Sequence, residues 1–77
     1  MTTLFNMLTA YGVEMKIIPL NLIDKDISGN KLLVSFEHEQ IVTNDVINLE
    51  SIDDKVITLN ELLYNRLKRF VRSLDKT

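Results

Sequence analysis

The heptapeptide DKDISGN at 24–30 has the spacing of the first half of a calcium-binding loop. Oxygen-bearing side chains fall at loop positions 1, 3 and 5, and a glycine falls at position 6, as calcium coordination requires. Position 12 needs a bidentate glutamate but is Ser35, and the flanking segments resemble strands instead of helices. Because Asp, Ser, Gly and Asn also favour tight turns, we interpret 24–30 as a loop and expect no metal site.

His38 is the only histidine, and it lies between Glu37 and Glu39. A histidine beside carboxylates can act as a general base for a hydroxyl nucleophile. On a strand, however, both glutamates would face away from His38, and no pattern places a nucleophile near it. Gly12 and Gly29 are too far apart to form a phosphate-binding loop. We therefore expect no catalytic residue, no cofactor site and no enzyme.

Four carboxylates gather in the second half of the chain: Asp45, Glu50, Asp53 and Asp54. Paired carboxylates can perform acid–base chemistry when burial separates their pKa values. Their neighbours here are polar turn residues, so we expect these groups to be solvated. An acidic rim of this kind could pair with a basic surface on a second copy of the chain.

The basic residues near the end of the sequence are the remaining candidates for binding: Arg66, Lys68, Arg69, Arg72 and Lys76. On a helix, Arg69, Arg72 and Lys76 would form a ridge because they are spaced three and four apart. Such a ridge could follow a phosphate backbone, and arginine favours recognition of phosphate or carboxylate groups. Against nucleic acid stand a pI of about 5.2 and the absence of an aromatic stripe beside the basic residues.

The composition is that of one small folded domain. The chain has 77 residues, of which 45% are hydrophobic and 26% charged, and it contains no cysteine. A domain of this size buries only about 60% of the surface of its unfolded chain, so self-association would be a useful source of stability. The net charge of −2 hides two opposed patches, because residues 1–60 carry −5 and residues 61–77 carry +3.

The sequence carries no recognisable membrane or export signal. No apolar run approaches the roughly 18 residues that cross a bilayer. The first twelve residues, MTTLFNMLTAYG, lack the basic flank of a signal peptide. We expect a cytoplasmic protein that does not associate with membranes.

The basic ridge would lie on an amphipathic helix predicted over 58–77. Thr58 and Glu61 have the spacing of a capping box at its start. The apolar residues of this segment share one broad helical face: Leu59, Leu62, Leu63, Leu67, Phe70, Val71 and Leu74. That face must be buried, and we expect it to cover a sheet.

A second, short helix is predicted over 3–11, capped by Thr2 or Thr3 and ending at Gly12. Its apolar residues recur at helical spacing: Leu4, Phe5, Met7, Leu8 and Tyr11. A helix this short is marginal alone, so its stripe must pack on its own domain or on a partner. We favour its own sheet.

Short strands are predicted between the two helices. Residues 14–23 resemble a strand that Pro19 confines to a sheet edge, because proline has no N–H for the ladder. Residues 31–39 alternate, and their buried face would consist of Leu32, Val34 and Phe36. The two segments would form a hairpin.

Further turns are predicted at 43–45 and 53–55. The first divides the apolar pieces 41–42 and 46–49, and the apolar pair 56–57 leads directly into the C-terminal helix. Loops this short favour pairing of strands that are neighbours in sequence. The sequence therefore predicts an α+β domain over 1–77: a short N-terminal helix, an antiparallel meander of three or four strands, and a long C-terminal helix on the sheet.

We predict a small non-enzymatic interaction or regulatory protein that acts through a protein–protein surface and self-associates as a homodimer. The alternative is a nucleic-acid-binding regulator that uses the basic face of the C-terminal helix. The candidate interaction residues lie on the two helices: Arg66, Lys68, Arg69, Arg72, Lys76, Leu4, Phe5 and Leu8.

Overall fold

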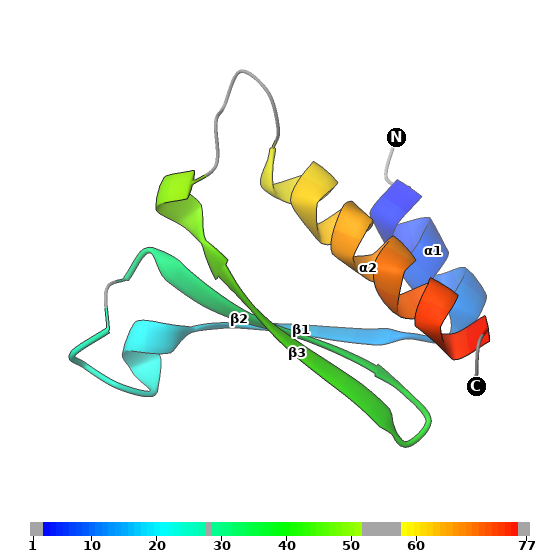
Figure 1. The fold of residues 1–77 in the computed structure, drawn as a ribbon, viewed down its shortest axis with the longest axis horizontal. Coiled ribbons are helices and arrows are strands. Elements are labelled where there is room, and N and C mark those ends of the chain that lie inside the picture. The colour runs from blue at the N-terminus through cyan, green and yellow to red at the C-terminus, as the bar shows by residue number, and fades with distance from the viewer. Residues whose placement is uncertain (1–2, 28, 52–57, 76–77) are drawn as a thin grey trace.

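Two helices lie on one face of a three-stranded sheet in the computed structural model, which describes residues 3–27, 29–51 and 58–75 (Figure 1). The predicted α+β class is confirmed, and three strands are present in these residues. In chain order the elements are α1 (Thr3–Tyr11), β1 (Glu14–Pro19), the 3-10 helix η1 (Leu20–Leu22), β2 (Lys31–His38), β3 (Ile41–Asn48), the 3-10 helix η2 (Leu49–Ser51) and α2 (Leu59–Asp75).

The sheet is an antiparallel meander with the strand order β1-β2-β3. Val34 at the centre of β2 lies opposite Ile17 on β1 and Asp45 on β3. Because side chains alternate along a strand, the register places these three residues on the same face, which is the face that the helices cover. The central strand β2 is paired on both sides, while β1 and β3 form the edges.

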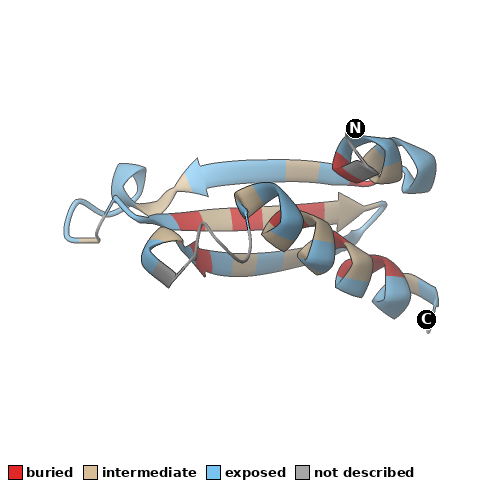
Figure 2. Ribbon diagram, turned by 90° about the horizontal axis from the view of Figure 1, so that it is seen from above, coloured by how far each residue is buried: buried red, intermediate tan, exposed pale blue. Residues whose placement is uncertain are grey.

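The core lies between β2 and α2 (Figure 2). Phe36 of β2 stacks on Phe70 of α2 with ring centroids 5.9 Å apart, and Leu67 is fully buried. The predicted inward face of β2 is confirmed, because all three of its residues are buried. The buried core comprises Leu4, Val13, Leu32, Val34, Phe36, Ile47, Leu63, Leu67, Phe70 and Val71.

The C-terminal helix begins where the capping signal predicts. The Glu61 backbone N–H donates a hydrogen bond to Thr58 Oγ1 at 3.2 Å, which satisfies one donor that the first helical turn leaves unpaired. The predicted apolar face is also confirmed. Four of its residues are buried, and the other three pack against the core while partly exposed: Leu59, Leu62 and Leu74.

Helix α1 ends in a Schellman motif at Gly12, as the glycine signal indicates. Gly12 has φ +64, its N–H donates to the Thr9 carbonyl at 3.3 Å, and the Val13 N–H donates to the Leu8 carbonyl at 2.9 Å. This tight connection leads directly into β1. Leu4 is buried in the common core and Leu8 is partly buried, so α1 packs on its own domain, where α2 is its neighbour.

Two predicted boundaries in the sheet were wrong. The first strand ends at Pro19 instead of 23, and the chain then forms η1. The segment 43–45 is not a turn, because it lies inside the continuous strand β3. Asn44 Oδ1 accepts a hydrogen bond from Ser35 Oγ at 2.6 Å across the ladder, so pairing with β2 overrides the local turn preference.

The turn between β2 and β3 instead contains Glu39 and Gln40, since His38 pairs with Ile41. Glu39 adopts φ 56, a conformation that two-residue hairpin turns require and that glycine or asparagine usually supplies. The predicted turn at 53–55 and the apolar pair 56–57 lie outside the described residues.

Candidate interaction surface

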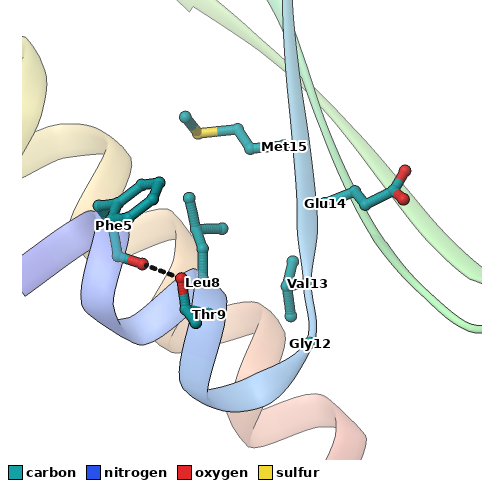
Figure 3. Close-up of a pocket in the computed structure, with 7 residues that line it drawn as sticks. All are labelled: Phe5, Leu8, Thr9, Gly12, Val13, Glu14 and Met15. Carbon is teal, nitrogen blue, oxygen red and sulfur yellow. Dashed lines mark hydrogen bonds between the residues drawn. The ribbon is translucent and has the colours of Figure 1, made fainter.

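A hollow of about 600 Å³ opens between α1 and β1. Phe5, Leu8 and Met15 point into the space between the helix and the strand, while Glu14 points away from it (Figure 3). Phe5 is 65% exposed although it is a large apolar side chain. The hollow is lined by Phe5, Leu8, Thr9, Gly12, Val13, Glu14 and Met15.

The helical period of α1 explains why Phe5 is left uncovered. Leu4 points into the core, and Met7 and Tyr11 line a second, smaller hollow together with residues of α2. Phe5 and Thr9, four residues apart, therefore lie on the side of α1 that faces away from α2. The Thr9 hydroxyl donates a hydrogen bond to the Phe5 carbonyl at 3.1 Å, so its polar group is already satisfied.

Strand β1 continues this apolar surface along the open edge of the sheet. Helix α2 crosses β2 and β3, whereas α1 lies over only the beginning of β1 (Figure 2). Ile17 is on the helix side of the sheet by register, yet it is 39% exposed. Exposed apolar groups beside an unpaired strand edge are typical of a site that another chain can cover. We call Phe5, Leu8, Met15 and Ile17 the α1–β1 surface.

The opposite face of the sheet carries a second, flatter group of apolar side chains. Ile18, Leu33 and Val46 form one cross-strand row by register, and Val46 is 54% exposed. Leu22 and Ile23 are also exposed beyond the end of β1. Neither of the two hollows includes any of these residues.

The predicted basic ridge is present in part. Arg69 and Arg72 are exposed on α2, and Arg66 is partly buried, as its position near the apolar border predicts. Lys68 Nζ lies 4.8 Å from the centroid of the Tyr64 ring, a cation–π contact that holds this lysine against its own helix. Lys76 lies outside the described residues.

Of the predicted apolar interaction residues, Phe5 and Leu8 belong to the α1–β1 surface. Leu4 is buried and therefore not accessible to a partner in this structure. Sequence reasoning missed Met15 and Ile17. The alternation of β1 places them on one face, but only the position of α2 shows that this face is incompletely covered.

His38 lies at the end of β2, where Nε2 is 3.9 Å from Glu39 Oε1. The expectation that Glu39 faces away was wrong, because Glu39 leaves the strand in the turn. His38 Nδ1 is buried, and no residue that the structure describes forms a hydrogen bond with it. The histidine thus lies beside a surface carboxylate, and no described hydroxyl is hydrogen-bonded to it.

Within the calcium-like segment, Asp24 to Asp26 form a local turn. The Asp26 N–H donates to Asp24 Oδ1 at 3.0 Å, which is the Asx turn that such sequences favour. Asn30 at the end of the segment donates to Glu50 Oε1 at 2.6 Å. Within the part of the chain that the structure describes, no three His, Asp or Glu side chains form a group that could hold a metal ion.

The structure describes two members of the predicted acidic cluster, and they lie in different elements. Asp45 lies within β3 and not in a turn, which corrects the expectation. Glu50 lies in η2, and Asp53 and Asp54 fall outside the described residues.

Among residues 3–27, 29–51 and 58–75, neither helix combines the length and the apolar character needed to span a bilayer. Comparisons of the chain with protein families, curated proteins and solved structures find no match.

Proposed function

We propose that this protein is a small non-enzymatic interaction protein that binds protein through the α1–β1 surface and self-associates there. The observation that carries the proposal is the hollow of about 600 Å³ beside the unpaired edge of β1, with Phe5 65% exposed at its rim. A strand edge supplies backbone hydrogen bonds, and an adjacent apolar hollow supplies selectivity for side chains.

Burial of this surface would be favourable. Covering a large apolar side chain contributes about 1.5–3 kcal/mol, and both Phe5 and Ile17 are available for this. A domain of 77 residues has a small core, so an interface would add to its stability as well as to its function.

Sedimentation velocity over a concentration series tests the proposal. The apparent mass of the wild-type protein should rise from the 8.9 kDa of the single chain towards twice that value as the protein concentration increases. Phe5→Ser should stay near the mass of the single chain. Val46→Ser is the matched control, because Val46 is similarly exposed but lies on the opposite face of the sheet. Equal association of the wild type and Phe5→Ser would refute the proposal.

A nucleic-acid-binding regulator is the second candidate, and the exposure of Arg69 and Arg72 favours it. The two arginines are spaced i and i+3 on α2, so both can face the same phosphate backbone. Fluorescence anisotropy of labelled duplex and single-stranded nucleic acid over a salt series tests this function. Binding that weakens steeply with salt and is lost in Arg69→Glu with Arg72→Glu would support it, and unchanged anisotropy at low salt would exclude it.

A further inference from the structure

Among residues 3–27, 29–51 and 58–75, no strand pairs with the outer edge of β1, and the residues along this edge form a pattern that is complementary to itself. We infer that two copies of the chain join their β1 strands antiparallel about a two-fold axis at Met15, forming a continuous six-stranded sheet. This inference depends on the proposed function, because it specifies how the α1–β1 surface is covered.

A two-fold axis perpendicular to the sheet restricts the possible arrangements. It pairs β1 with its copy in antiparallel fashion and keeps the helix side of both sheets on the same side. The residue on the axis then lies opposite the same residue of the second copy. A residue a given number of positions before it lies opposite the residue that many positions after it in the second copy. Five such registers lie within the strand ahead of Pro19. Centring on Ile18 pairs only Ile17 with Pro19 inside β1, which leaves four registers, centred on Glu14, Met15, Lys16 or Ile17.

Charge separates these four registers. With Met15 on the axis, Glu14 lies opposite Lys16 of the second copy, and the symmetry produces this unlike pair twice. Centring on Glu14 or on Lys16 places like charges directly opposite each other, which is unfavourable. Centring on Ile17 places Lys16 opposite the apolar Ile18 of the second copy and leaves Glu14 without a cation.

The intramolecular sheet strengthens this argument. Glu14 lies opposite Glu37 of β2, so two carboxylates already face each other on one side of β1. Like charges in that position are destabilising. A cation from the open side would relieve the repulsion, and Lys16 of the second copy supplies it in the register centred on Met15.

The apolar side of β1 fits the same register. Met15 and Ile17 lie on the helix side of the sheet, opposite Phe36 and Val34 of β2. In the inferred register Met15 would lie opposite Met15 of the second copy, and Ile17 opposite its Val13. Val13, with Leu8 of α1, lines the hollow, so the exposed Ile17 of each copy lies at the hollow of the other. The empty space and the uncovered side chain are therefore parts of one interface.

The ends of β1 limit the pairing to a short ladder. Gly12, with its φ of +64, begins the turn into α1, and Pro19 at the other end has no N–H to donate. The Val13 N–H already donates to the Leu8 carbonyl, so the backbone that remains for the ladder is Glu14 to Ile17. The other edge strand, β3, offers no comparable match, since Ile41–Asn48 contains no basic residue to oppose Asp45.

A charge exchange tests the register. Glu14→Lys or Lys16→Glu alone changes two attractive pairs into repulsive ones. Each should raise the dissociation constant of the dimer, measured by sedimentation, roughly tenfold or more. The double variant Glu14→Lys with Lys16→Glu should restore it. Lys31→Glu is the control, because it makes the same charge change as Lys16→Glu at an exposed position on β2. A double variant that dimerises no better than the single variants would overturn the register.

A cysteine experiment tests the axis independently. The natural chain has no cysteine, so Met15→Cys introduces one thiol per copy. In the inferred register the two thiols face each other across strands whose Cα atoms are roughly 4.5–5.5 Å apart, within disulfide range. Oxidised glutathione should then produce a covalent dimer. Ile17→Cys should form it far more slowly, because its two copies are offset by four residues, roughly 13 Å along the strands.

The outcomes separate this inference from the proposed function. Preferential cross-linking of Met15→Cys supports both. In a second outcome, Phe5→Ser abolishes the dimer, but Met15→Cys cross-links no faster than Ile17→Cys. That result refutes the β1 register and leaves the α1–β1 surface as the interface. A wild type that remains at the mass of the single chain refutes both.

Discussion

Replacing Leu67 by alanine should remove most of the stability of the domain. Leu67 is fully buried and, with Phe36 and Val34, is one of the three largest side chains that are completely shielded from solvent. Leucine-to-alanine changes at such sites cost about 3–5 kcal/mol, since the lost transfer free energy is increased by the cavity that remains. A chain of 77 residues has a total stability of about 4–12 kcal/mol, so the change is a large fraction of it.

Thermal unfolding followed by circular dichroism measures the effect. A loss of about 3 kcal/mol should lower Tm by roughly 12–24 °C for a domain of this length. Leu62→Ala is the matched control, because Leu62 lies on the same face of α2 but is only partly buried, and its Tm should fall much less. All variants are compared at one protein concentration, since dimerisation would make Tm depend on concentration.

A cooperative transition for Leu67→Ala within a few degrees of the wild type would refute this reasoning. In that case α2 would not cover the sheet in solution. Helix α2 would then be an arm whose apolar face is open to a partner, and the assignment of the interface to α1 and β1 would lose its basis.

Three further changes test local parts of the structure. Thr58→Ala removes the hydroxyl that caps α2 and should reduce the free energy of unfolding by about 1 kcal/mol in urea denaturation, whereas an unchanged midpoint would show that the cap is dispensable. Gly12→Ala should lower the free energy of unfolding by about 1–2 kcal/mol, because alanine is strained at φ +64. Space is not the cause, since the added Cβ would meet no atom within 4 Å. Unaltered stability would contradict the Schellman ending of α1. His38→Ala should leave dimer formation in sedimentation unchanged, because His38 belongs to the central strand β2, which is paired on both sides and has no open edge; a loss of dimer would place the interface elsewhere.

The two helices could be predicted from sequence because each carries its signal locally. In α2 the apolar residues repeat at the helical period, and Thr58 and Glu61 mark the start. In α1, Gly12 marks the end with the one residue type that adopts positive φ without strain. These signals depend on neighbours within a few residues, so no knowledge of the tertiary fold was needed.

The strand boundaries were less predictable because they depend on partners distant in sequence. Thr43, Asn44 and Asp45 are typical turn residues, yet β2 pairs with all three and Ser35 binds the Asn44 side chain. The real turn at Glu39 lacks the glycine or asparagine that would have marked it. Tertiary pairing determined both positions.

The candidate surface was predictable only in part for the same reason. Phe5 could be proposed from the stripe of the first helix. Met15 and Ile17 could not, because both resemble ordinary inward residues of a strand until the path of α2 leaves the edge of β1 uncovered. The charge pattern of Glu14 and Lys16 acquires meaning only once that edge is known to be open.

Amide hydrogen exchange of the two edge strands over a concentration series tests the central claim most directly. Backbone amides between Val13 and Ile17 that point away from β2 should become protected as concentration rises, while the outward amides of Ile41–Asn48 on β3 should exchange at a constant rate. Equal and concentration-independent exchange at both edges would contradict the claim that β1 is the surface through which this protein associates.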